Sequence, residues 1–233
     1  MDDVIRFVYL YQFADGSSKK FDLHLAEPDL RLQANQAGGL PLWALLSYEQ
    51  CEHCPLDRKD HLYCPIAANL AGIVEEFKNF LSHERVNVTV LCAERAYAKE
   101  TTVQGGLSPL LGIIMTTSGC PIMEQLKPMV RFHLPFASLD ETIFRGVTMY
   151  LLSQYFRHQD GKDAAWSLEG LAPIYGEVGK VNRDFARRMQ AAAKKDANVN
   201  ALVNLDVFAS MMTFAAEDTL NRLKPSFAAL IDR

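Results

Sequence analysis

The chain has 233 residues and a formal net charge of -4 at pH 7. A chain of this length can bury one sizeable core, so it does not need a metal or disulfides merely to fold. The weak negative charge gives no field that attracts nucleic acid or an anionic membrane, and we expect neither as a partner. A protein partner or a homo-oligomer stays open, and the sequence leaves any small-molecule substrate unknown.

The N-terminal stretch MDDVIRFVYLYQF begins acidic and alternates between apolar and polar residues. This pattern lacks the basic region and apolar run of a signal peptide, and no apolar run in the chain reaches the length that crosses a bilayer. We therefore expect a cytoplasmic protein, in which thiols stay reduced and clustered cysteines indicate metal or redox sites more often than disulfides.

The first hundred residues alternate between strand and helix signals. β-branched and aromatic runs on both sides of ADGSS predict a β-hairpin over 4–25. A Pro/Gly-marked connection leads to a short helix near 41–48. Apolar residues at steps of three and four predict a helix from Pro65, and the alternating stretch from Val86 to Cys92 predicts a third strand. Cys92 continues the apolar face of that strand, so we expect it in the core.

Beyond residue 100 the pattern is helical almost to the end. Helices are predicted over 108–119, over 138–161 with the capping box Ser138-x-x-Glu141, over 170–195 and over 198–224. The basic residues of the third of these helices, in KVNRDFARRMQAAAKK, are expected on a solvated face.

The predicted fold is α+β and mostly helical, with a small N-terminal antiparallel sheet, made of the hairpin and the third strand, packed on a helical bundle-like body. One domain covers 1–233, with a mixed part over 1–99 that holds the cysteine-rich loop and a helical part over 100–233.

The stretch CEHCPLDRKDHLYCP places Cys51, Cys54 and Cys64 within fifteen residues. The Cys-x2-Cys spacing lets two sulfurs face one ion, and a closed zinc site needs a fourth ligand. The candidates are His53, His61 and Cys120. Cys120 is preferred because Cys54, Cys64 and Cys120 each precede a proline, which suits the first position of a helix and places the cysteine at a cap that favours a thiolate.

The predicted function is therefore a metal-binding protein in which Cys51, Cys54, Cys64 and Cys120 hold a structural zinc that ties the two parts together. An iron-sulfur cluster is the alternative cofactor, since cysteine before proline also occurs in ferredoxins. A thiol-dependent redox or nucleophilic enzyme that uses Cys120 with Cys51 and Cys54 is the alternative function, so whether the protein is an enzyme stays open. Reduced cysteines that pack in a core are the simplest alternative.

A second group of polar residues follows Cys120 and consists of Arg131, His133, Glu141 and Arg145. Arg131 could bind an anionic group, and His133 could act as a base for Cys120. The simpler interpretation is structural: His133 forms a buried hydrogen bond, Glu141 caps a helix, and Arg145 pairs with Glu141 four residues away.

Three segments resemble a bacterial protein family of unknown function over most of the chain. They are LPLWALLSYEQCEHCPL, TTSGCPIMEQLKPMVRFHLPFA and DETIFRGVTMYLLSQYF. The resemblance implies a bacterial source and a single structural unit. It implies no reaction and no catalytic residue.

Overall fold

The computed structural model describes residues 4–33, 39–192 and 195–232. It confirms the predicted α+β, mostly helical fold, with one antiparallel sheet whose strands follow the order β3-β2-β1-β4-β5. The strands are β1 (Val4–Phe13), β2 (Ser18–Ala26), β3 (Arg31–Leu32), β4 (Arg85–Leu91) and β5 (Ala96–Thr102). The helices are α1 (Pro65–Phe77), α2 (Val103–Thr117), α3 (Lys127–Arg131), α4 (Leu139–Gln159), α5 (Leu171–Ala192), α6 (Ala197–Phe214), α7 (Ala216–Leu223) and α8 (Ala228–Ile231), with short 3-10 turns η1 (Leu42–Ala44), η2 (Met123–Leu126) and η3 (Lys224–Phe227).

The sheet contains the predicted hairpin and third strand, and β1 pairs with both β2 and β4. Two further strands, β3 and β5, have little apolar alternation and were not expected from the sequence. β3 has two residues and β5 is mostly polar. Both lie at the edges of the sheet, where a strand buries little side-chain surface and therefore needs no apolar alternation. Cys92 lies just beyond β4 and is half-buried, and its Sγ donates to the carbonyl of Arg95.

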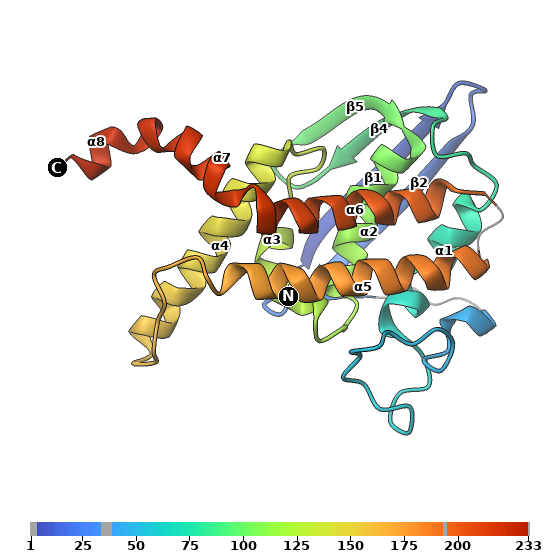
Figure 1. Cartoon of the computed structure of the whole chain (residues 1–233). Coiled ribbons are helices and arrows are strands. Elements are labelled where there is room, and N and C mark those ends of the chain that lie inside the picture. Colours follow the sequence, from blue (N-terminus) through green and yellow to red (C-terminus); the bar gives the residue numbers. More distant parts are fainter. Residues whose placement is uncertain (1–3, 34–38, 193–194, 233) are drawn as a thin grey trace.

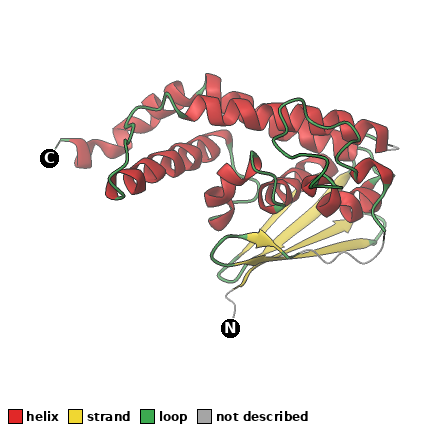
Figure 2. Ribbon diagram, turned by 90° about the horizontal axis from the view of Figure 1, so that it is seen from below, coloured by secondary structure: helices red, strands yellow, loops and turns green. Residues whose placement is uncertain are grey.

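Helices cover one face of the sheet (Figure 2). α2 contacts β4 and β5 on one side and α6 on the other. A Cβ on Gly106 of α2 would come within 2.7 Å of Val88 Cγ2, so glycine permits this close approach of helix and sheet. The Tyr11 hydroxyl of β1 donates to the Gly106 carbonyl at 2.9 Å and fixes the same contact.

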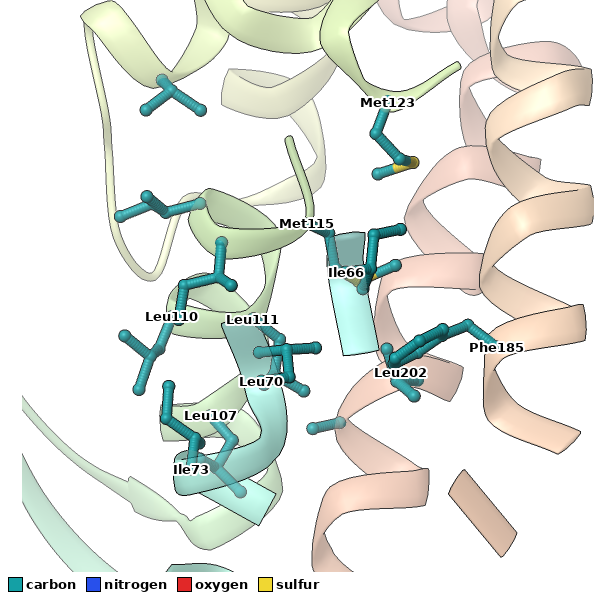
Figure 3. Close-up of a cluster of buried hydrophobic side chains, with 14 of the residues drawn as sticks. Ile66, Leu70, Ile73, Leu107, Leu110, Leu111, Met115, Met123, Phe185 and Leu202 are labelled. Atoms are coloured by element: carbon teal, nitrogen blue, oxygen red, sulfur yellow. The ribbon is translucent and has the colours of Figure 1, made fainter. Parts of the chain in front are cut away.

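The core continues from the sheet into the helical layers. Residues of α1 and α2 meet side chains of α5 and α6 in one apolar cluster, of which Ile66, Leu111, Phe185 and Leu202 are members (Figure 3). α5 and α6 lie side by side as the outer pair of helices (Figure 1). The pair and the sheet thus enclose α2 from both sides.

α4 and the segment α7–α8 extend away from the body, and the C-terminus lies at the end of the second extension (Figure 1). The single helix predicted over 198–224 is broken at Ala215, where α6 ends and α7 begins. The short helix predicted near 41–48 is the 3-10 turn η1. Within the described ranges, no single helix is long and apolar enough to span a membrane, although the bent pair of α6 with the segment through α8 passes that test of length and composition.

Candidate functional site

The cysteine-rich loop, residues 45–64, is fastened to α5 by a buried arginine. Arg188 is 1% exposed, and its Nη1 donates to the carbonyls of Trp43 and Leu45, both at 2.7 Å. Its Nη2 donates to the carbonyl of Glu49 at 3.1 Å. The expectation that the basic residues of this helix all face solvent is therefore wrong for Arg188.

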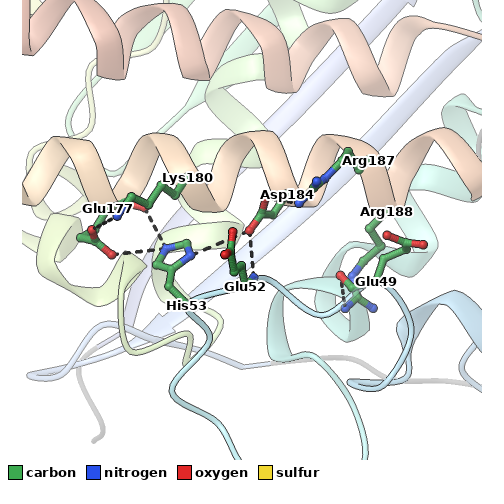
Figure 4. A network of polar contacts seen from close by, with 8 residues as sticks. All are labelled: Glu49, Glu52, His53, Glu177, Lys180, Asp184, Arg187 and Arg188. Atoms are coloured by element: carbon green, nitrogen blue, oxygen red, sulfur yellow. Dashed lines mark hydrogen bonds and ion pairs between the residues drawn. The ribbon is translucent and has the colours of Figure 1, made fainter.

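Charged residues on the same face of α5 hold the middle of the loop (Figure 4). His53 Nε2 lies 3.5 Å from a carboxylate oxygen of Glu177, and His53 Nδ1 lies 3.8 Å from Asp184 Oδ2. The Glu52 N–H donates to the same Asp184 oxygen at 3.1 Å. His53 thus turns toward α5, and His61 is exposed to solvent.

The four cysteines proposed as ligands influence one another electrostatically. Burial is the main cause that raises the pKa of Cys51 to about 12, and charge on Cys64, Asp184, Cys54 and Cys120 raises it further. Cys64 is the N-cap of α1 with Pro65 behind it, as the sequence predicts. Backbone N–H groups at the helix start lower its pKa, but burial outweighs them and the net shift is upward. The pKa of Cys120 is raised for the same reason.

The predicted function as a structural zinc protein is corrected by this geometry. Among the described residues, no group of three or more His, Cys, Asp or Glu side chains is arranged to hold a metal ion. The iron-sulfur alternative needs such a group too. The thiol-enzyme alternative needs a thiolate, whereas burial keeps Cys51 and Cys120 protonated at neutral pH. All five cysteines are free thiols.

The second polar group has mostly structural roles. Arg131 forms an ion pair with Glu27. The Tyr9 hydroxyl and His133 Nε2 share a 2.6 Å hydrogen bond, and burial lowers the pKa of His133 to about 3, so the imidazole is neutral. Glu141 forms the predicted capping box with Ser138. The expected pairing of Arg145 with Glu141 is not formed. The Nη2 of Arg145 donates instead to the carbonyls of Met129 and Phe132.

Arg145 lines a cavity of about 440 Å³ that the sequence did not indicate. The wall comes from β5, α2, the segment from η2 through the start of α4, α5 and α6. Most of the lining side chains are apolar, including Ile113, Val178, Leu205 and Phe208. This volume lies within the range of roughly 300–1,000 Å³ that small-molecule sites occupy.

One polar residue in the cavity wall carries a signal that sequence reasoning missed. Asn182 interrupts a stripe of α5 at helical spacing, and the other members of that stripe are buried hydrophobic residues: Leu171, Tyr175, Val178, Phe185 and Met189. Asn182 is 2% exposed, and its Oδ1 has no hydrogen-bond partner among the described residues. A polar residue on an apolar stripe marks a position where packing is not the sole requirement.

These features define the class of the protein as a mostly helical α+β protein whose sheet and helices line a mostly apolar cavity. The family described as a domain of unknown function (DUF6901) matches residues 7–228, and the chain belongs to this family. The resemblance to an uncharacterised family is thus confirmed. No curated protein and no solved structure matches the chain.

Proposed function

We propose that the protein binds a small, largely apolar organic molecule in the cavity between β5, α2, α5 and α6. The cavity itself carries this proposal: a volume of about 440 Å³ with a mostly apolar wall lies beside the buried apolar core. A ligand that enters this space removes part of the apolar wall from water, which is favourable roughly in proportion to the apolar area covered.

The elements that form the cavity give it a defined shape. α2 is fixed against the sheet through Gly106, and α5 is fixed against the cysteine-rich loop through Arg188. A preformed wall favours binding, because little conformational freedom is lost when the ligand enters. A reducing compartment such as the cytoplasm fits this role, since the five cysteines are free thiols.

The experiment that tests the proposal is titration with Nile red, a neutral dye that fluoresces in apolar surroundings. We expect saturable binding of one dye per chain. Ala209→Phe places a ring in the cavity and should abolish binding, because Ala209 lines the cavity. Val207→Phe is the matched control, since Val207 lies on the same helix with 53% of its surface exposed and should leave binding unchanged.

A second variant keeps the test decisive if Ala209→Phe fails to fold. Gly112 also lines the cavity, and a Cβ there would meet one atom, Leu205 Cδ2, at an ordinary contact distance of 3.6 Å. Gly112→Leu should therefore fold and reduce dye binding. Unsaturable dye binding, or equal binding by wild type and both cavity variants, contradicts the proposal.

A further inference from the structure

The charged residues that line the cavity are both cationic. They are Lys99 of β5 and Arg145 of α4, and no described Asp or Glu belongs to the lining. His133 also lines the cavity but is neutral, since burial lowers its pKa to about 3. The wall therefore carries a net positive charge: Arg145 is half-buried beside mostly apolar side chains, and Lys99 is exposed to solvent. Electrostatic interactions at Arg145 are stronger than in water, because burial lowers the effective dielectric constant.

Arg145 is held in place with part of its guanidinium unused. One nitrogen, Nη2, donates to the carbonyls of Met129 and Phe132 and fixes the plane of the group. Nε and Nη1 make no hydrogen bond within the described part of the chain. Burial lowers the pKa of Arg145, and nearby Tyr175 and Glu141 oppose that shift only in part. The Glu141 carboxylate, one turn away, is taken by the capping box with Ser138.

Among the described residues, neighbouring cations have carboxylate partners, whereas Arg145 and Lys99 do not. Arg131 pairs with Glu27, and Lys127 pairs with Glu124 at 2.8 Å. Lys99 lies over the Phe136 ring, 5.9 Å from its centre, and neither it nor Arg145 has a salt bridge to a described carboxylate. A half-buried guanidinium without a carboxylate partner is costly, and an anion that enters the cavity would remove that cost.

A polar group at a second point of the wall limits the ligand further. Tyr175 and Asn182 are seven residues apart on α5, which corresponds to about 10 Å along a helix. Burial raises the pKa of Tyr175, and the nearby charge of Arg145 opposes that shift in part, so Tyr175 marks the cationic end. The unpartnered amide of Asn182 marks the other end, with Val178 between the two.

We propose that the ligand of this cavity is an amphipathic carboxylate: its carboxylate binds Arg145 and Lys99, its apolar body packs on Val178, Leu205 and Phe208, and a polar group reaches Asn182. This inference rests on the proposed function and names the chemical class of the ligand. A carboxylate suits this wall, because Nη1 or Nε of Arg145 can donate a charge-assisted hydrogen bond to a carboxylate oxygen, and Lys99 adds a second cation. No covalent step is involved.

The experiment compares three ligands of equal chain length by displacement of Nile red: decanol, decanoate and ω-hydroxydecanoate. We expect wild type to bind decanoate at least about tenfold more tightly than decanol, as a charge-assisted hydrogen bond implies. ω-Hydroxydecanoate should bind more tightly than decanoate, and Asn182→Leu should remove that second difference alone.

Variants of the cations identify the carboxylate site. Arg145→Met should reduce the preference for decanoate over decanol to less than about threefold while decanol still binds, because the charge-assisted bond is lost. Lys99→Met should reduce the preference in part and does not disturb the bonds to Met129 and Phe132. Arg131→Met is the matched control, since Arg131 does not line the cavity, and it should retain the full preference.

The outcomes separate the two proposals. Equal binding of decanol and decanoate by wild type overturns the carboxylate inference and leaves the cavity as a site for neutral ligands. A preference that survives both Arg145→Met and Lys99→Met also overturns it. Failure of all three ligands and of the dye to bind overturns the proposed function and the inference together.

Discussion

The two faces of α5 support regions of opposite character. One face holds the cysteine-rich loop through Glu177, Asp184 and Arg188, and the other lines the cavity with Tyr175 and Asn182. The loop contains reactive residue types, but His53 contacts α5 and burial keeps the Cys51 thiol protonated. Arg188 of α5 spends both Nη atoms on backbone carbonyls, and only its buried Nε has no partner among the described residues. The cavity wall is mostly apolar, and two of its polar residues, Arg145 and Asn182, have unused hydrogen-bonding capacity. Unsatisfied groups that line an accessible cavity indicate a ligand more directly than a cluster of reactive side chains does.

The largest expected effect tests whether the loop depends on its arginine. Arg188→Leu removes a buried cation, leaves the carbonyls of Trp43 and Glu49 without a donor among the described residues and leaves that of Leu45 with the Tyr48 N–H alone, so the free energy of unfolding should fall by about 3–5 kcal/mol. Arg187→Leu is the matched control: Arg187 is exposed and pairs with Asp184, and its loss should cost about 0–1 kcal/mol. Urea denaturation measures both, and equal losses would show that the loop does not depend on this clamp.

The next effect tests the protonated thiols. Because its pKa is about 12 rather than the ordinary 9.0, Cys51 in the folded protein should react with iodoacetamide at pH 8 roughly 10³-fold more slowly than in urea. Mass mapping after timed alkylation measures the rate at this residue. Labelling of Cys51 at the same rate in folded and unfolded protein would mean that burial does not suppress the thiolate.

A third effect concerns the neutral histidine in the cavity wall. The pKa of His133 is about 3 in the folded protein and near its ordinary 6.5 in the unfolded chain, so between these values the unfolded state binds a proton that the folded state does not. Stability is therefore lost as pH falls from 6.5, by about 2–3 kcal/mol at pH 4.5 from this residue.

The measurement for His133 is urea denaturation at pH 7 and pH 4.5 for wild type and His133→Asn. The variant should lose about 2–3 kcal/mol less than wild type over this interval. His61→Asn, at an exposed histidine, is the control and should behave as wild type. The same pH dependence in all three proteins would contradict the buried neutral imidazole.

The smallest expected effect is the change in stability on replacing two glycines with alanine: Gly146, which packs against Tyr175 of the cavity wall, and Gly176, which has open space around it. A Cβ on Gly146 would lie 2.6 Å from Met212 Cε and 2.7 Å from the Tyr175 hydroxyl, so Gly146→Ala should cost about 1 kcal/mol. Gly176 has open space around it, and Gly176→Ala should stabilise α5 by up to about 1 kcal/mol. Thermal unfolding measures the two shifts, and stabilisation by both would mean that the wall at Tyr175 adapts freely.

Local signals in the sequence predicted much of the fold. The hairpin and third strand follow from alternation, and the start of α4 follows from the Ser138 and Glu141 capping box, because hydrogen bonds within a few residues determine these features. The break at Ala215 had no such signal, since no Gly or Pro stands there. The weakly patterned β5 forms because its neighbour β4 offers a strand edge.

The candidate site could be predicted far less well. The cysteine pattern was plain in the sequence, but the function attached to it was wrong, because burial and side-chain arrangement are not encoded in spacing. The four-residue spacing on one helix predicted that Arg145 pairs with Glu141, whereas in the structure Arg145 donates to the carbonyls of Met129 and Phe132. Asn182 could have been noticed as the polar member of an apolar stripe.

The sequence by itself determined the fold class, the position of the hairpin and the cap at Cys64, since each depends on residues close together in the chain. The tertiary structure alone decided that Arg188 is buried, that Cys51 keeps its proton, and that Arg145 faces a cavity beside Tyr175. The physical reason is that desolvation and unfilled volume depend on every element packed around a residue. The cavity forms only when β5, α2, α4, α5 and α6 come together, and Arg188 is buried only when α5 packs against the loop.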